Sequence, residues 1–98
     1  MALLSDEQVR QQLQNLNGWS QQGKAIVRQF EFPDFKAAME FVNHIADAAE
    51  SAGHHPDITI NYNKVTLLLT SHDAGGVTDR DARMAAKINE VSGSRRAA

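Results

Sequence analysis

Three of the four histidines in this 98-residue chain are placed so that they could do chemistry together. His54 and His55 stand side by side directly before Pro56, and His72 follows in the same half of the chain. An imidazole has an ordinary pKa of about 6.5, so it can give or take a proton near neutral pH. One interpretation is therefore a site for general acid–base catalysis.

Other interpretations compete with this one. Adjacent residues of an extended chain point to opposite sides, so His54 and His55 could not easily share one metal ion, and the sequence has no His-x-x-x-His pair. Nucleophilic catalysis would need a cysteine or a serine in a nucleophile-elbow motif, and neither is present. The residues alone leave two interpretations equally open: acid–base catalysis, and polar loop histidines without a function.

Charged side chains near the histidines could assist them. Glu50 precedes His54 by one helical turn, and Asp81 falls in the first turn of a predicted helix. Either carboxylate could orient a histidine, although the spacing of Asp81 also predicts a helix cap. Arg80 is either a solvated cation or a substrate contact. His44 lies within a predicted helix, opposite most of its apolar positions, and we expect it at the surface without a role.

The elements that must position these side chains follow from hydrophobic spacing and capping signals. Ser5 with Gln8, and Thr78 with Asp81, have the spacing of capping boxes. The pattern predicts helices at 6–16, 35–52 and 78–91, with strands at 25–32, 57–62 and 64–70. We expect one α+β domain over 1–98, ordered over about 4–92 with a frayed tail at 93–98. It would be a two-layer domain, with helices packed on one face of an antiparallel sheet of three to four strands.

The last two predicted strands bring the histidines together. A tight turn around Asn63 and Lys64 would join them as a hairpin. In an antiparallel hairpin the start of the first strand lies beside the end of the second. His72 would therefore lie close to His54 and His55, at one edge of the sheet.

The composition argues against several classes of protein. Without cysteine, disulfides, zinc–thiolate sites and thiol nucleophiles are excluded. The net charge of −2 lacks the basic excess of a dedicated nucleic-acid binder. The start, MALLSDEQ, has no signal-peptide pattern, and no apolar run approaches the ~20 residues that span a bilayer. We expect a cytoplasmic protein that binds neither nucleic acid directly nor a membrane.

The same residues resemble the signature of the pterin-4a-carbinolamine dehydratases. The pattern E-x-x-x-H-H-P runs from Glu50 to Pro56 and is followed by Tyr62, His72 and Asp81 at the family's spacings. The segments GW at 18–19, FPDF at 32–35, YNKV at 62–65 and TSHDAGGVTDRD at 70–81 agree with it. The resemblance covers roughly residues 4–92.

The resemblance implies dehydration of 4a-hydroxytetrahydrobiopterin to quinonoid dihydropterin, in the recycling that follows aromatic amino acid hydroxylation. It implies no metal and no organic cofactor, and a homodimer or homotetramer. The implied roles fall on three groups of residues: catalytic His54, His55 and His72; substrate-binding His54, His55, Pro56, Thr70, Ser71, His72 and Asp73; supporting Glu50, Arg80 and Asp81. His55 would mainly bind substrate, and Trp19 would form an aromatic wall for the pterin, part of the core or part of an interface. The alternative is a non-catalytic dimerisation or transcriptional coactivator module.

Overall fold

The structure is a computed structural model that describes residues 2–97, with side chains described for 2–93. It contains three helices and four strands in the order α1 (Asp6–Leu13), β1 (Ser20–Gln22), β2 (Ala25–Glu31), α2 (Phe35–Ala52), β3 (Asp57–Asn61), β4 (Lys64–Leu69) and α3 (Asp79–Ala97). The strands form one antiparallel sheet in the order β1-β2-β4-β3. The predicted α+β class is confirmed.

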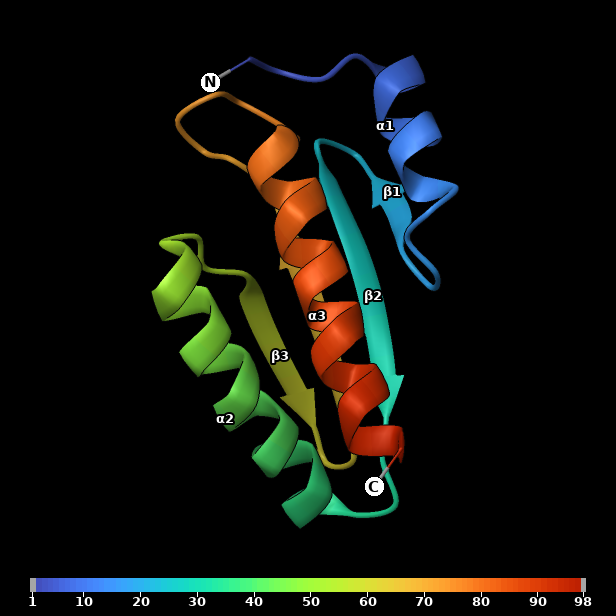
Figure 1. Ribbon diagram of the computed structural model, residues 1–98, viewed down its shortest axis with the longest axis vertical. Helices are drawn as coiled ribbons and strands as arrows, with labels where there is room; N and C mark the ends of the chain where they lie inside the picture. The colour runs from blue at the N-terminus through green and yellow to red at the C-terminus, as the bar shows by residue number, and fades with distance from the viewer. Residues whose placement is uncertain (1, 98) are drawn as a thin grey trace.

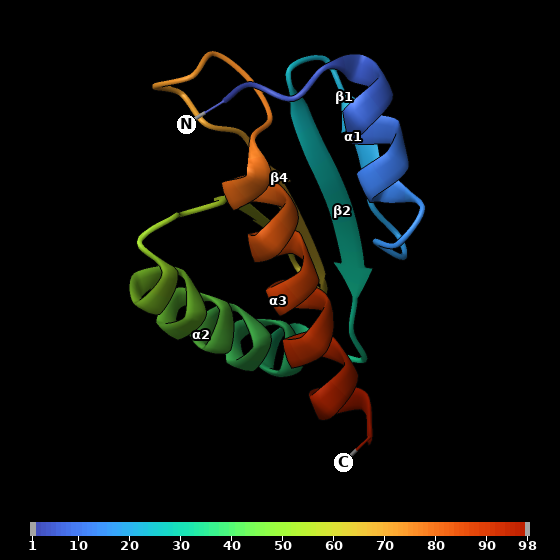
Figure 2. The same ribbon diagram turned by 45° about the horizontal axis from the view of Figure 1, so that its top comes forward.

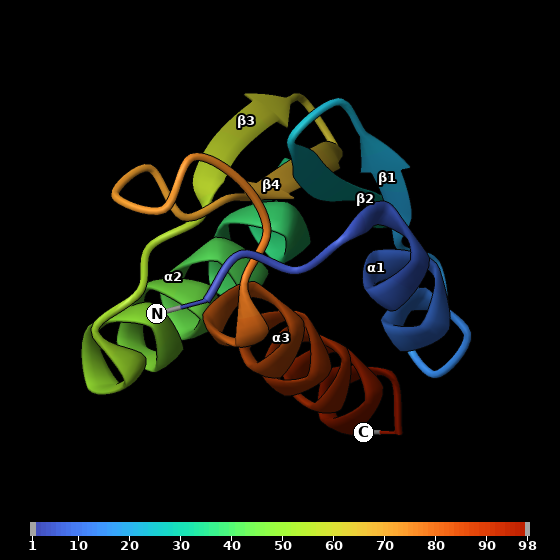
Figure 3. The same ribbon diagram turned by 90° about the horizontal axis from the view of Figure 1, so that it is seen from above.

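The helices cover one face of the sheet and leave the other uncovered (Figure 3). Helix α2 packs against α3, both contact β4, and α1 contacts β1. Figure 1 shows α2 and α3 running along the length of the sheet, with α1 beside them at the β1 edge. This is the predicted arrangement of two layers.

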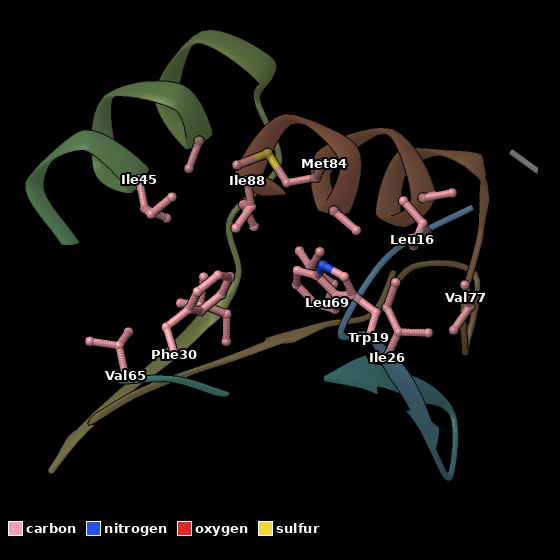
Figure 4. Packing of buried hydrophobic residues seen from close by; sticks show 14 of the residues in the cluster. Leu16, Trp19, Ile26, Phe30, Ile45, Val65, Leu69, Val77, Met84 and Ile88 are labelled. Carbon is pink, nitrogen blue, oxygen red and sulfur yellow. The ribbon is translucent and has the colours of Figure 1, made fainter. Parts of the chain in front are cut away.

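The core lies between these layers. Val65, Leu67 and Leu69 alternate along β4 on the face toward the helices, and each is fully buried. Helix side chains such as Ile45 and Ile88 meet them from the opposite side (Figure 4). Burying one side chain of this size contributes about 1.5–3 kcal/mol, so the alternating pattern of β4 is sufficient to fix which face of the sheet turns inward.

Capping residues fix both ends of α2, as the sequence predicts. The side chain of Asp34 accepts a hydrogen bond from the backbone N–H of Ala37. At the other end Gly53 adopts the left-handed conformation, with a φ of 66°. The backbone N–H of His54 then donates to the carbonyl of Ala49. The cap therefore sets the direction in which the histidine doublet leaves the helix.

Two helix ends differ from the prediction by three residues or more, and one strand was not predicted. Helix α1 ends at Leu13 rather than Leu16, and α3 continues to Ala97 rather than ending near Val91. The later end arises because Gly93 does not adopt the left-handed conformation that would have terminated α3. The frayed tail predicted at 93–98 falls almost entirely outside the residues whose side chains are described.

Strand β1 was not predicted, because its sequence, SQQ, has no apolar residue. It forms because Gly23, with a φ of 59°, allows a tight turn that pairs Ser20 with Val27. Within the described part of the chain, none of the helices is both long enough and apolar enough to span a bilayer.

Candidate active site

Two segments that carry the predicted site residues leave the sheet at the same end. The chain from α2 enters β3 through residues 54–56, and β4 leaves through the loop 70–78 that leads into α3 (Figure 1). Asp57 at the start of β3 pairs with Leu68 near the end of β4, as the predicted hairpin requires. In Figure 1 this loop and the last turn of α2 both lie in the upper left of the molecule, and Figure 2 shows the chain passing from that turn toward the sheet below the loop. The hairpin prediction is confirmed.

His54 is paired with a buried carboxylate. Its Nε2 lies 2.5 Å from Oδ1 of Asp81, the third residue of α3. The Asp81 side chain is 0% exposed and that of His54 only 11% exposed. Two residues separated by 27 positions are thus joined in an environment with little access for water.

Asp81 is held by two further donors on its other oxygen. Oδ2 accepts from the backbone N–H of Thr78 at 2.8 Å and from the hydroxyl of Ser71 at 2.9 Å. The first of these bonds is the acidic half of the predicted capping box, so Asp81 both caps α3 and contacts His54. A buried carboxylate needs donors of this kind to offset the loss of water.

The arrangement fixes which nitrogen of His54 carries a proton. A carboxylate has no proton to donate, so Nε2 of His54 must be the donor to Oδ1. That leaves Nδ1 as the nitrogen that can exchange a proton with a bound molecule. Among the described residues, Nδ1 of His54 has no hydrogen-bond partner.

His55 is paired with Glu50, but in a different environment. Its Nε2 lies 2.5 Å from Oε2 of the glutamate, and the two side chains are 61% and 77% exposed. Both carboxylates considered in the sequence therefore contact a histidine. Asp81 contacts His54, and Glu50 contacts His55 rather than His54. Because both members face solvent, this pair contributes little to stability.

His72 lies on the loop after β4 and is exposed. It lines a hollow of about 320 Å³ together with Lys24, Ala25, Thr70 and Gly75. The hydroxyl of Thr70 donates to the carbonyl of Lys24 at 2.7 Å, which joins the loop to the turn between β1 and β2. Sequence reasoning missed Lys24, because no pattern within the motif points to a turn so far away in the chain.

Neither His54 nor His55 lines that hollow. The link between His72 and the doublet in this structure is Ser71, which precedes His72 and bonds the carboxylate that holds His54. That the three imidazoles act on one bound molecule remains a prediction. In the described residues no group of three His, Cys, Asp or Glu side chains is arranged to hold a metal ion.

Arg80 and Asp73 form an ion pair across the base of the loop. Nη2 of Arg80 lies 2.6 Å from Oδ1 of Asp73. This hydrogen bond is the main reason that the pKa of the Asp73 carboxyl lies below its ordinary value. Because the pKa is lower in the folded state, the pair stabilises the fold above the ordinary aspartate pKa of about 3.9. The contribution is lost as the pH falls through the lowered pKa of Asp73.

In Arg80→Ala, the pKa of Asp73 is expected to rise toward about 3.9, because its main hydrogen-bond donor is gone. An NMR titration of the side-chain carboxyl in both proteins measures the change. Lys87→Ala, which removes a cation from the exposed side of α3, is the control and should leave Asp73 unchanged. The same titration midpoint in wild type and Arg80→Ala would contradict the assignment.

Two other residues considered in the sequence lie outside this site. Trp19 is 6% exposed, belongs to the core and donates from Nε1 to Oδ1 of Asn89 at 2.8 Å (Figure 4). Of the roles predicted for Trp19, the core role fits this position. His44 is exposed on α2, and its Nδ1 contacts the carbonyl of Glu40. The prediction that His44 is a surface residue is confirmed.

Comparison with known proteins points to one family. The family model described as "Pterin 4 alpha carbinolamine dehydratase" matches residues 2–91. A protein of Koribacter versatilis, provisionally named a pterin-4-alpha-carbinolamine dehydratase, is 58% identical over 90% of this chain and 94% of its own length. A protein of Thermomicrobium roseum with the same provisional name is 52% identical over 94% of this chain and 99% of its own.

Solved structures agree with the fold. A "transcriptional coactivator/pterin dehydratase" from Brucella melitensis superimposes with a TM-score of 0.86 at 37% identity, covering 90% of this chain and 96% of the other. A pterin dehydratase-like protein described as a RuBisCO assembly factor gives a TM-score of 0.67 at 24% identity, over 79% of this chain and 92% of its own. At 24% identity, the second comparison supports a shared fold and nothing further.

Proposed function

Because this chain belongs to the pterin-4-alpha-carbinolamine dehydratase family, we propose that it is a hydro-lyase acting on a 4a-hydroxytetrahydropterin. The products are quinonoid dihydropterin and water, and the physiological setting is tetrahydrobiopterin recycling after aromatic amino acid hydroxylation, in the cytoplasm. The observation that supports this most is the nearly buried His54–Asp81 pair beside the loop that carries His72.

The reaction needs only two proton transfers. The C4a–O bond breaks, and the leaving hydroxide takes up one proton to become water. A second proton leaves the adjoining ring nitrogen, whose electron pair completes the new carbon–nitrogen double bond. No electrons enter or leave overall, so imidazoles can supply all of the chemistry.

The proposal assigns these transfers to His54 and His72. Nδ1 of His54 is open for proton exchange, since Nε2 is committed to Asp81. His72 lines a hollow open to solvent, where a heterocycle could enter. His55, held toward Glu50, would mainly bind the substrate, while Pro56, Thr70 and Asp73 would complete the pocket wall.

Turnover is expected to be indifferent to chelators. Nε2 of His54 and Nε2 of His55 contact carboxylates on two different helices, and the described residues include no group of three His, Cys, Asp or Glu side chains that could hold a metal ion. The measurement is the dehydration rate before and after EDTA treatment and gel filtration. Loss of rate that one divalent ion restores would overturn the proton-only mechanism.

We also propose that the active species is a homodimer or homotetramer. Strand β3 is an edge strand whose five residues are all exposed. Ile58 and Ile60 lie along it as exposed apolar side chains, and the exposed ring of Tyr62 follows directly after it. An uncovered apolar edge of this kind is a common site of association. Sedimentation equilibrium at micromolar concentration should give two or four copies, and a monomer would contradict the proposal.

A non-catalytic coactivator or dimerisation module is the alternative. The name of the Brucella melitensis protein contains both activities, so the family comparison does not choose between them. The His54–Asp81 pair favours the enzyme, because an interaction module has no need for a nearly buried histidine with one open nitrogen.

Pterin binding separates the two functions. Titration of the protein into a fluorescent pterin, followed by fluorescence quenching, should show saturable binding that weakens in His55→Ala. His44→Ala, which changes an exposed histidine of α2, is the matched control and should bind like wild type. Absence of binding by a folded protein would reject the enzyme and favour the interaction module.

A further inference from the structure

We propose that Ser71 and Thr78 are positioning residues, whose hydroxyls hold Asp81 so that His54 presents Nδ1 to the substrate. This inference rests on the proposed function and deepens it. It also gives Ser71 a role different from the substrate contact that the family resemblance implies, and it adds Thr78, to which the sequence assigned only a helix cap.

Every polar atom of Ser71 is already engaged inside the protein. The residue is 1% exposed. Its N–H donates to the carbonyl of Gly76 at 2.9 Å, and its own carbonyl accepts from the N–H groups of Ala74 and Gly75 at 3.0 and 2.9 Å. Its hydroxyl contacts Asp81 and Thr78. Ser71 therefore has no hydrogen-bond donor left to offer a bound pterin.

The donor and the acceptor in each hydrogen bond of Ser71 and Thr78 can be assigned. The Ser71 hydroxyl must donate to Oδ2 of Asp81, because a carboxylate only accepts. With its single hydrogen used, Ser71 can only accept from the Thr78 hydroxyl, 2.8 Å away. The chain of donors thus runs from Thr78 through Ser71 to Asp81, and all three side chains are buried.

These hydrogen bonds fix the orientation of the Asp81 carboxylate. Oδ2 receives the Ser71 hydroxyl and the Thr78 N–H, so the plane of the carboxylate is fixed and Oδ1 is the oxygen left for Nε2 of His54. Without the hydroxyl donors, the backbone N–H of Thr78 would be the one donor left of the two on Oδ2, so the carboxylate could turn about this single hydrogen bond and Nε2 would lose its defined acceptor. His54 would then sample both neutral tautomers, of which only one leaves Nδ1 unprotonated.

Ser71 also couples the two catalytic positions. Its backbone closes the tight turn that carries His72, while its side chain reaches the carboxylate that holds His54. One residue therefore determines how the loop of His72 sits relative to His54. A short polar side chain suits both roles, since a larger one would not fit a site that is 1% exposed.

The kinetic test compares variants that remove a hydroxyl with variants that keep it. Ser71→Ala and Thr78→Val should each lower kcat about tenfold, the scale of losing a hydrogen bond to a charged group, with KM within about twofold of wild type. Thr78→Ser keeps the hydroxyl and should retain wild-type kcat. Ser92→Ala removes another buried serine, well along α3, and is the matched control for loss of a buried hydroxyl.

Nitrogen-15 NMR of the His54 ring gives a readout that does not depend on activity. Wild type and Ser92→Ala should show a single neutral tautomer with the proton on Nε2. Ser71→Ala and Thr78→Val should show shifts averaged between the two tautomers. Unchanged His54 shifts in both variants, or a raised KM with unchanged kcat, would overturn the positioning role. A wild-type protein with the expected tautomer but no dehydratase activity would instead refute the proposed function and leave this inference intact.

Discussion

In His54→Ala, kcat for dehydration is expected to fall about 10²–10³-fold, the range for losing a general acid or base. The reason is that no neighbouring group can take over its proton transfer. His55 is held toward Glu50 on the exposed side, and Asp81 is fully buried behind His54. Single-turnover kinetics on freshly generated carbinolamine measure the chemical step without interference from product release.

Two further variants, His72→Ala and the control His44→Ala, are needed to interpret the loss of kcat in His54→Ala. His72→Ala should show a loss on the same scale, because the reaction requires a partner for the second proton transfer. His44→Ala should react like wild type, since His44 is an exposed histidine of α2 whose Nδ1 contacts the backbone carbonyl of Glu40. If His54→Ala and His72→Ala both kept the wild-type rate, the assignment of acid and base would be wrong.

Asp81→Asn is expected to lower kcat by roughly 10³–10⁴-fold, as occurs when the aspartate that fixes a catalytic histidine tautomer becomes an amide. The amide oxygen can still accept from Ser71 and Thr78, which turns the NH₂ group toward His54. Nε2 must then accept, and the proton moves to Nδ1, the nitrogen required for chemistry. Nitrogen-15 NMR should show this reversed tautomer directly.

The same substitution should leave the protein folded. It removes one charge but keeps the shape and the cap of α3, so the free energy of unfolding should fall by no more than about 1–3 kcal/mol. Urea denaturation measures this loss. Asp79→Asn, in the same first turn but exposed, is the matched control and should change neither rate nor stability by a comparable amount. Full activity in Asp81→Asn would show that the tautomer of His54 does not matter.

Much of the fold could be predicted because its signals are local. Asp34 and Gly53 bound α2, and the alternation of Val65, Leu67 and Leu69 identifies the buried face of β4. Strand β1 could not be found in this way, because SQQ carries no apolar alternation and pairs only after the turn at Gly23 has formed. The extension of α3 past Gly93 likewise contradicts the local signal, since a glycine ends a helix only when it adopts the left-handed conformation.

The candidate site likewise contains features that local sequence signals predict and features that they do not. The hairpin register could be predicted and places the His72 loop at the same end of the sheet as the doublet. The pairing of His54 with Asp81 was one of two options, because either Glu50 or Asp81 could reach a histidine. The buried position of Ser71 was not predictable, since nothing local distinguishes an inward hydroxyl from one that lines a pocket. Such contacts join residues distant in the chain and require the tertiary structure.

Stopped-flow decay of freshly generated 4a-carbinolamine, metal-free and near neutral pH, tests the central claim most directly. The comparison requires buffer alone, wild-type protein, His54→Ala and the His44→Ala control. We predict that wild type and His44→Ala accelerate the loss of the carbinolamine equally, and that His54→Ala removes most of the acceleration. Decay at the buffer rate with folded wild-type protein, or full acceleration by His54→Ala, would contradict a dehydratase that works through His54.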